Sequence, residues 1–285
     1  MSKKTDQHDV LVRFILENRP IRGELVYLDE SYREVLHRHP YPLTIQRWLG
    51  ELLAGASLLS ATLKYEGSLI IQVQGDGPLS LLLGQANSER HIRGLAKWEG
   101  TVPENLHEAL GQGKMVITID PGSGTQRYQG IVDLRGNNLA RIIENYFYQS
   151  EQLPTFLYLC ANESRAVGFL LQSLPDEKKH ESMDDWLHVE HLASTLTDKE
   201  LLELPAETIL HRLFHQESVR IFKAEAVQFH CRCSRDAMSR AIFTMGKEEA
   251  RQLAEEHQVV SVTCEFCNKK EDFDRIDVER IFYGK

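Results

Sequence analysis

The chain has 285 residues, of which 42% are hydrophobic and 26% charged, and its formal net charge is −9. This composition is typical of a folded chain that can form one sizeable hydrophobic core and a smaller additional domain. The first residues contain no apolar run of the kind found in secretory signals, and no stretch approaches the length of a membrane span. We therefore expect a cytoplasmic protein without a membrane partner.

The acidic excess is concentrated in the middle of the chain. Asp and Glu against Lys and Arg count 19 to 17 over residues 1–175, 12 to 6 over 176–228, and 11 to 10 over 229–285. None of these segments is basic enough to hold a phosphate backbone through counterion release. We therefore expect no nucleic-acid partner.

Residues 1–175 are predicted to form one mixed α/β domain. Apolar periodicity predicts helices over 6–17, 41–63 and 138–149. The helix over 41–63 is apolar on almost every side, which predicts burial in the core, and Pro42 suits its first turn. Two hairpins are predicted, with strands over 69–74 and 79–84 and over 115–120 and 125–134, followed by strands over 155–160 and 166–173.

No residues in this domain have the spacing of a catalytic site, so we do not expect an enzyme. Gly75-Asp76-Gly77 and Gly122-Ser123-Gly124 could be mistaken for phosphate-binding loops, but neither opens a helix after a strand with the required spacing. Hairpin turns are the preferred interpretation of both. Cys160 ends an apolar, strand-like run, and we interpret it as an inert core thiol.

Residues 176–228 are predicted to be a metastable helical linker. Short amphipathic helices are expected over 184–196, 198–204 and 206–215, each with capping residues near its start. Helices of this length are marginal alone, so the linker should dock on a neighbour and be able to detach.

Five of the twelve histidines lie in this linker: His180, His188, His191, His211 and His215. His188 and His191, and likewise His211 and His215, have helical spacing that would suit a second metal or a response to pH. No carboxylate or thiol completes either set in sequence, so solvated helix faces are the preferred interpretation.

Four of the five cysteines lie near the C-terminal end, Cys231 and Cys233 in His-Cys-Arg-Cys-Ser, and Cys264 and Cys267 in Thr-Cys-Glu-Phe-Cys-Asn. Two close pairs about thirty residues apart are typical of a single tetrahedral sulfur site for zinc or an iron–sulfur centre. A disulfide within Cys-x-Cys would be strained and easily reduced, which suits a switch better than a permanent cross-link. The sequence thus predicts a small metal-binding domain over 229–285.

Four basic residues lie close to these cysteines in the sequence: Arg232, Arg235, Lys269 and Lys270. Four thiolates on one Zn²⁺ carry a formal charge of about −2. The basic residues either offset that charge or form a solvated rim, and the sequence does not decide between the two.

Motifs along most of the chain carry a family resemblance. They are Arg-Gly-Glu-Leu-Val at 22–26, Thr-Leu-Lys-Tyr-Glu-Gly at 62–67, Gln-Gly-Asp-Gly-Pro at 74–78, Arg-Tyr-Gln-Gly at 127–130, Tyr-Phe-Tyr-Gln-Ser-Glu-Gln-Leu-Pro-Thr at 146–155, Leu-His-Arg-Leu-Phe-His at 210–215, and the cysteine pairs with Ser234-Arg235-Asp236 and Phe266. In this order they resemble the redox-regulated holdase chaperones of the thirty-three-kilodalton heat-shock family. The chain departs from that family at Glu271, where an aromatic residue is common.

The resemblance implies a chaperone that works without ATP and is inactive while reduced, with one Zn²⁺ per chain on Cys231, Cys233, Cys264 and Cys267. Oxidants would convert the cysteines into two disulfides, Cys231–Cys233 and Cys264–Cys267, one of three pairings that four cysteines allow. Zinc would leave, the C-terminal domain would unfold and the linker would detach. The implied partners are unfolding client proteins during oxidative stress and, in the oxidised form, a second copy of the chain.

Two functions of other classes remain as alternatives. A zinc-ribbon regulator would bind DNA or RNA with a salt-dependent affinity, which the balanced charge of residues 229–285 disfavours. A thiol–disulfide oxidoreductase would place Cys264-x-x-Cys267 at the start of a helix after a strand. Here the pair follows the apolar run at 259–263 and enters a polar turn.

Overall fold

The computed structural model describes residues 8–63, 66–122, 126–174 and 179–283, with the side chains of 179–182 outside the described set. Helices and strands are mixed along the chain, as the α+β prediction required. The chain divides into two compact units, Met1–Phe229 and His230–Lys285, which are described separately below.

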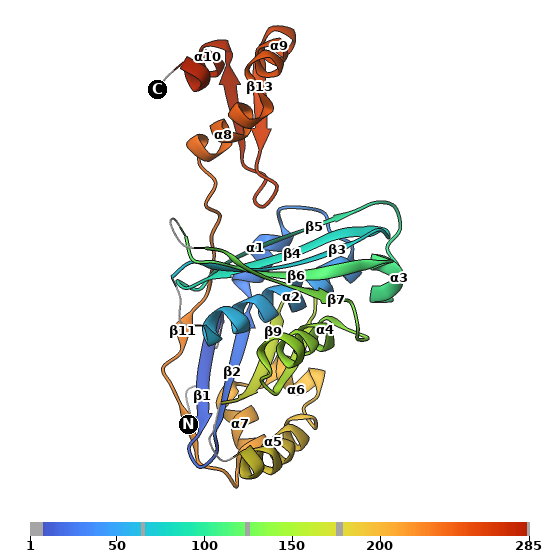
Figure 1. Ribbon diagram of the computed structural model, residues 1–285, viewed down its shortest axis with the longest axis vertical. Helices are drawn as coiled ribbons and strands as arrows, with labels where there is room; N and C mark the ends of the chain where they lie inside the picture. The colour runs from blue at the N-terminus through green and yellow to red at the C-terminus, as the bar shows by residue number, and fades with distance from the viewer. Residues whose placement is uncertain (1–7, 64–65, 123–125, 175–178, 284–285) are drawn as a thin grey trace. The chain divides into compact units, whose positions relative to one another are not determined.

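Two antiparallel sheets form the framework of the first unit (Figure 1). In the described residues, the first sheet has the order β10-β1-β2-β9-β8, with β11 also on β1: β1 Val10–Leu16, β2 Ile21–Leu28, β8 Thr155–Ala161, β9 Ala166–Ser173, β10 Val219–Ile221 and β11 Glu225–Ala226. The second has the order β12-β5-β4-β3-β6-β7: β3 Ser68–Gly75, β4 Leu79–Asn87, β5 His91–Trp98, β6 Gly113–Asp120, β7 Tyr128–Asp133 and β12 Gln228–Phe229. Only the β12–β5 pair is parallel among these described ladders.

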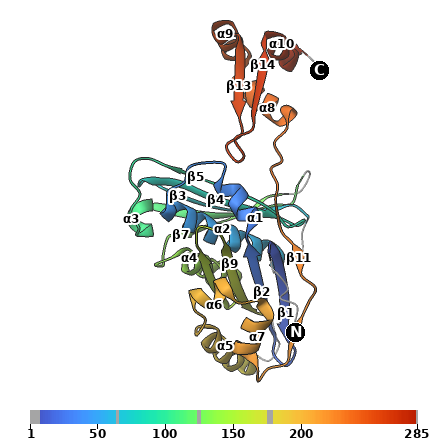
Figure 2. The same cartoon turned by 180° about the vertical axis from the view of Figure 1, so that it is seen from behind.

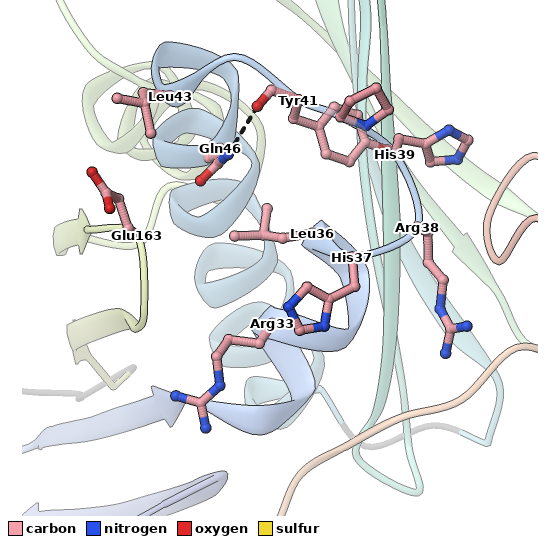
Figure 3. A pocket seen from close by; sticks show the side chains of 10 residues that line it. Arg33, Leu36, His37, Arg38, His39, Tyr41, Leu43, Gln46 and Glu163 are labelled. Atoms are coloured by element: carbon pink, nitrogen blue, oxygen red, sulfur yellow. Dashed lines mark hydrogen bonds between the residues drawn. The ribbon is translucent and has the colours of Figure 1, made fainter.

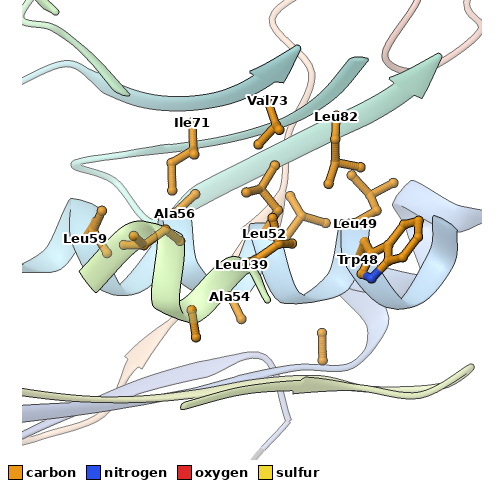
Figure 4. Packing of buried hydrophobic residues seen from close by; sticks show 14 of the residues in the cluster. Trp48, Leu49, Leu52, Ala54, Ala56, Leu59, Ile71, Val73, Leu82 and Leu139 are labelled. Atoms are coloured by element: carbon orange, nitrogen blue, oxygen red, sulfur yellow. The ribbon is translucent and has the colours of Figure 1, made fainter. Parts of the chain in front are cut away.

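Helix α2 (Leu43–Thr62) lies between the two sheets, and most of its residues are buried. Figure 4 shows Leu52 and its neighbours packed beneath the second sheet, with the first sheet on the opposite side of the helix. Small residues allow this close approach, because a Cβ at Gly50 would lie 2.7 Å from the Cβ of Ala161. The predicted buried helix is therefore confirmed, with Pro42 as its N-cap.

Three further helices complete this layer: α1 Glu30–Leu36, α3 Leu106–Leu110 and α4 Leu139–Tyr146, the last continuing into a π-helical turn, η1 Phe147–Glu151. Asp9 fixes the start of α1, because its carboxylate accepts the backbone N–H groups of Asp29, Glu30 and Ser31. The predicted hairpin at 69–84 and the strands near 155–160 and 166–173 are confirmed. The hairpin at 115–134 is also confirmed, although residues 123–125 of its turn lie outside the described residues.

The predicted helix over residues 6–17 is wrong, because Val10–Leu16 is strand β1. Both faces of this strand are covered: Leu11 belongs to the core around α2, while Val12, Phe14 and Leu16 belong to the core on the other face. A strand buried on both faces gives a continuous apolar run, which cannot be distinguished from a buried helix by periodicity. The β-branched and aromatic residues of the run favour the strand.

Three helices of the predicted linker cover the other face of the first sheet: α5 Lys179–Ala193, α6 Asp198–Glu203 and α7 Ala206–Phe214. Their buried side chains form a second hydrophobic core with strands β1, β2, β8 and β9; they are Trp186, Val189, Ala193, Leu201, Ala206, Ile209, Leu210, Leu213 and Phe214. Thr197 and Glu200 form a capping box at the start of α6, as capping residues in the sequence predicted.

The second unit contains a hairpin of β13 (Val259–Thr263) and β14 (Lys270–Asp274) with three helices, α8 Arg235–Met245, α9 Lys247–His257 and α10 Arg275–Tyr283. Its core is small, with seven buried apolar residues in the described part: Met238, Ile242, Ala250, Ala254, Val260, Phe273 and Val278. Across the described residues, no helix combines the length and apolar character needed to cross a membrane.

Candidate metal centre

The four C-terminal cysteines come together at one point in the second unit. Their Sγ atoms all lie within 4.8 Å of one another, with Cys231 and Cys264 at 3.6 Å and Cys233 and Cys267 at 3.3 Å. Four sulfurs bound to one zinc at about 2.3 Å lie about 3.8 Å apart in a tetrahedron. The donor set and its spacing therefore fit a metal ion bound by four thiolates.

Two turns position these sulfurs. Cys231 and Cys233 lie in the extended segment before α8, whose N-cap Ser234 accepts the N–H of Ala237 at 3.1 Å. Cys264 and Cys267 lie in the turn between β13 and β14. There Cys264 donates its N–H to the Lys269 carbonyl at 2.9 Å.

The turn of the second pair closes on Asn268, which has a φ of 55° and donates its N–H to the Cys264 carbonyl. Asn tolerates this left-handed conformation better than most residues with a side chain. An Asn directly after Cys-x-x-Cys was therefore a signal for the turn that the sequence analysis did not use.

Burial raises the pKa of the Cys233 thiol above its usual range, and its hydrogen bonds with Cys267 and Cys231 add to the rise. A free thiol at this position keeps its proton at neutral pH. Because a metal binds thiolate and not thiol, metal binding here must release protons, and acid must weaken it.

Carboxylates of β14 and α10 pair with Arg235, Lys269 and Lys270 near the cluster. Arg235 pairs with Glu271 at 3.2 Å and Asp277 at 2.6 Å, while Lys269 pairs with Glu271 at 2.8 Å. Lys270 lies 3.3 Å from a carboxylate oxygen of Asp272. The pKa of Lys269 is raised, first by its hydrogen bond to Glu271 and then by the charge of that carboxylate.

Glu271, the departure from the family pattern, has a defined place in this unit. It lies on β14 opposite Val262 and joins Arg235 to Lys269. The Arg235 guanidinium also lies over the Phe273 ring, 4.4 Å from its centroid. Glu271 therefore connects the start of α8 to the turn of the second cysteine pair through ion pairs.

The linker histidines with described side chains do not assemble into a second metal site. His188 lies 3.4 Å from Glu217, and the rings of His211 and His215 are 6.3 Å apart, while the side chain of His180 lies outside the described residues. Within the described ranges, no other group of three or more His, Cys, Asp or Glu side chains is gathered like the cysteines. Cys160 is buried, and burial raises its pKa to about 12, as expected for an inert thiol.

A cleft of about 610 Å³ in the first unit, where α1 leads into α2, has no arrangement suited to catalysis (Figure 3). Its lining residues are Arg33, Leu36, His37, Arg38, His39, Pro40, Tyr41, Leu43, Gln46 and Glu163. Arg33 pairs with Glu30, Arg38 pairs with Glu34, and the Gln46 amide donates to the Tyr41 carbonyl. The labelled side chains point in different directions and do not converge on one point.

Comparison with known proteins now decides the family. The family described as Hsp33 protein matches residues 9–274 of this chain. The chain belongs to the Hsp33 family. A 33 kDa chaperonin of Shewanella sediminis is 48% identical over 276 residues, covering 96% of each chain. One of Nitrosococcus oceani is 47% identical over 278 residues, covering 97% of this chain and 95% of the relative.

The fold of the family also extends over this chain. The crystal structure of the 33 kDa chaperonin of Thermotoga maritima matches with a TM-score of 0.83 at 22% identity, covering 96% of this chain and 98% of that one. Membership of the Hsp33 family confirms the resemblance found in the sequence motifs and places the chain among chaperones. The four-cysteine cluster is compatible with a redox-regulated metal site in such a chaperone.

Proposed function

We propose that this protein is a redox-regulated holdase that binds unfolding client proteins without ATP. The observation that carries the proposal is the convergence of Cys231, Cys233, Cys264 and Cys267 in a unit with a very small core of its own. Zn²⁺ is the metal that four thiolates in this spacing suit, and it would be held by all four in the reduced protein. Structural zinc contributes on the order of 10–16 kcal/mol to small modules, so the second unit depends on it for folding.

Oxidation is the step that removes the ligands. In the proposed active form, Cys231 pairs with Cys233 and Cys264 with Cys267. Each disulfide forms when two thiolates give up two electrons to an oxidant such as peroxide, which takes two protons from solvent and leaves as two water molecules. Disulfide sulfur no longer binds zinc as a thiolate does, so the ion leaves and the second unit unfolds.

The consequence for the first unit follows from chain connectivity. Strand β12 ends at Phe229, two residues before Cys231, so the last ordered part of the linker is joined directly to the cluster. Unfolding of the second unit leaves that segment without a folded neighbour at its C-terminal end. The helices α5 to α7, each short and supported mainly by one face of the first sheet, then detach.

Detachment exposes two apolar surfaces that are buried in the reduced state. One is the inner face of the linker helices, including Trp186, Ile209 and Phe214, and the other is the sheet face with Phe14 and Phe169. Such surfaces hold unfolding clients by hydrophobic contact. The acidic polar face of the linker would keep the opened form in solution, and the oxidised form is expected to be a homodimer.

The test follows zinc and client together on the same samples. Zinc release is measured with a chromogenic chelator during peroxide treatment at mildly raised temperature, while light scattering records aggregation of a chemically unfolded client. We expect about one zinc per chain to leave as aggregation is suppressed, and reductant with zinc to reverse both. Zinc that leaves without any gain in holding activity would show that the cluster is only structural.

A matched pair of variants tests the ligand assignment. Cys264→Ser should bind zinc more weakly and lose the normal redox response, because three thiolates hold the metal less tightly than four. Cys160→Ser changes a buried thiol outside the cluster and should leave zinc stoichiometry unchanged. Normal zinc content and normal activation in Cys264→Ser would contradict the assignment.

A further inference from the structure

The linker ends in an extended segment that covers an edge of each sheet in the first unit. We call residues 217–229 the strap; it contains β10, β11 and β12. β10 and β11 pair in turn with β1, the edge strand of the first sheet, and β12 then pairs with β5 of the second sheet. Figure 2 shows this segment running along β1 on its way to β11. Without the strap, β1 would present an open row of backbone groups.

Backbone hydrogen bonds hold the strap to this edge. Glu17 donates its N–H to the Ser218 carbonyl at 2.9 Å, and Phe222 donates to the Arg13 carbonyl at 2.8 Å. Farther along, Val227 donates to the Asp9 carbonyl at 2.7 Å. Bonds of this kind do not depend on side-chain identity, so the edge can accept many sequences in extended conformation.

Val219 of β10 is partly buried against the second core, but the next two apolar side chains of the strap are largely exposed. Ile221 is 38% exposed and Phe222 is 43% exposed, although both are apolar. Farther along the strap, Val227, at 2% exposed, enters the core around α2, and Phe229 packs against that core. The segment over β1 is therefore held by pairing rather than by packing, which suits a segment that must leave.

Ion pairs of Glu225 also attach the strap to the first unit. Glu225 of β11 pairs with Arg13 of β1 and with Arg90, whose Nε lies 2.8 Å away. Glu24 of β2 stands directly across from Arg13 and is buried, and both arginines act on its charge. Burial raises the pKa of Glu24 to about 8, so its carboxyl is protonated at neutral pH and does not replace Glu225 as a counter-charge. When the strap departs, Arg13, which is already half exposed, becomes solvated.

We propose that the β1 edge vacated by the strap receives an extended segment of client polypeptide by backbone pairing. This inference rests on the proposed function and adds a second mode of client binding to hydrophobic contact. The seven residues of β1 span about 24 Å, enough for a client strand of similar length. The occupant is an unfolded client because the edge accepts its present strand chiefly through backbone groups, and an unfolded chain offers such groups throughout.

Hydrogen exchange of the full-length protein, read residue by residue, tests the proposal. The N–H groups of Ile15 and Glu17 face the strap, since β1 pairs alternately with its two neighbours and Glu17 bonds to Ser218. The N–H groups of Val12 and Phe14 face β2 and serve as an internal control. Three states are compared: reduced, oxidised, and oxidised with chemically unfolded citrate synthase.

We expect the Ile15 and Glu17 amides to lose protection about tenfold or more on oxidation and to regain it with the client, while Val12 and Phe14 stay protected. A held client with Ile15 and Glu17 unprotected would overturn the proposal, and so would protection that never falls on oxidation. Protection regained without client and lost on dilution would assign the edge to a second copy of this chain. Failure to hold client at all would instead contradict the proposed function.

A matched pair of variants gives an independent readout. Ile15→Pro removes a backbone N–H that would donate a hydrogen bond to a carbonyl of the client strand. Proline is tolerated on edge strands, so the variant should still fold. Ile15→Val keeps both the N–H and the β-branched side chain. We expect the oxidised proline variant to hold client several-fold less well than the valine variant, and equal holding by two folded variants would contradict the inference.

Discussion

The two units of this chain reach stability by different routes. In the first, α2 is covered by sheets on two sides, and a single contiguous core includes residues from nearly all of its strands. In the second, seven buried apolar residues and a hairpin surround four cysteines. Under the proposed function, a redox signal can act on one unit alone, because the four cysteines that an oxidant would change lie in the unit with the smaller core.

Of the predicted effects, metal removal should give the largest difference between the two units. When a zinc chelator is added to the reduced protein, the second unit should lose on the order of 10–16 kcal/mol of stabilisation and unfold. Hydrogen exchange should show loss of protection in β13 and β14 while α2 and β3 remain protected. Zinc added back with reductant should restore the hairpin, and a hairpin that stays protected without metal would contradict this account.

Truncation of one leucine in each layer of the first unit should give the next largest effects. Leu52→Ala in α2 removes a fully buried side chain between two sheets and should cost about 2–5 kcal/mol of global stability. Leu213→Ala in α7 should instead destabilise the docked linker by a similar amount and raise holding activity in the reduced state. The unfolding midpoint and the light-scattering assay measure these two outcomes.

Leu187, also on the linker and 54% exposed, provides the matched control. Leu187→Ala should change neither the unfolding midpoint nor the reduced-state activity. If Leu213→Ala lowered the global midpoint as much as Leu52→Ala, the linker would be part of the permanent core and not a releasable layer.

Helix α2 and the linker helices also show which features could be predicted from the sequence. The α2 helix and the linker helices were predictable because long apolar or amphipathic periodicity and capping residues are local signals. The four cysteines were predictable as a site because their paired spacing is specific to sulfur coordination. Strand β1 was misread because both of its faces are buried, one against α2 and one against the linker.

Other features could not be predicted because they depend on partners distant in sequence. The strands of the strap, β10, β11 and β12, are short, and their side chains are mostly exposed. They form only because β1 and β5 offer edges for backbone pairing. Glu24 lies in an apolar strand opposite Arg13, and its burial depends on how the two sheets meet. The local sequence pattern carries no information about the pairing of the strap or about the burial of Glu24.

The two units should also differ in their response to pH. Burial raises the pKa of Glu24 to about 8, so the folded first unit binds a proton that the unfolded chain gives up above about pH 4.5. The stability of the first unit therefore falls as the pH rises from about 4.5 to about 8. In the second unit, ion pairs and hydrogen bonds lower the pKa values of Glu271, Asp272 and Glu279, so stability there falls as pH drops.

Glu24→Gln tests the first half of this contrast. The amide mimics the protonated carboxyl, so the variant should gain stability over the parent as pH rises from about 4.5 to about 8 and no further above that. Thermal unfolding of the first unit at several pH values across this range measures the difference. A stability difference that does not vary with pH would show that Glu24 is ionised in the folded protein.

The smallest expected effect concerns the linker within the first unit. The Thr197 hydroxyl accepts the N–H of Glu200, and the Glu200 carboxylate accepts the N–H of Thr197, which together cap the start of α6. Thr197→Ala should cost α6 about 1 kcal/mol, because it removes the hydroxyl that accepts the Glu200 N–H and that donates to the Glu200 carboxylate. The amides of α6 should exchange faster while those of α2 do not change.

Thr195→Ala is the control, since the Thr195 hydroxyl donates to the Leu192 carbonyl and caps no helix start. Because α6 has only six residues, a loss of this size is a large part of its stability, whereas the same loss within α2 would be absorbed by contacts with two sheets. The threshold for linker release should therefore fall in Thr197→Ala, with holding activity appearing at a lower temperature after oxidation. If release were governed by the metal alone, both threonine variants would activate at the same temperature as the parent.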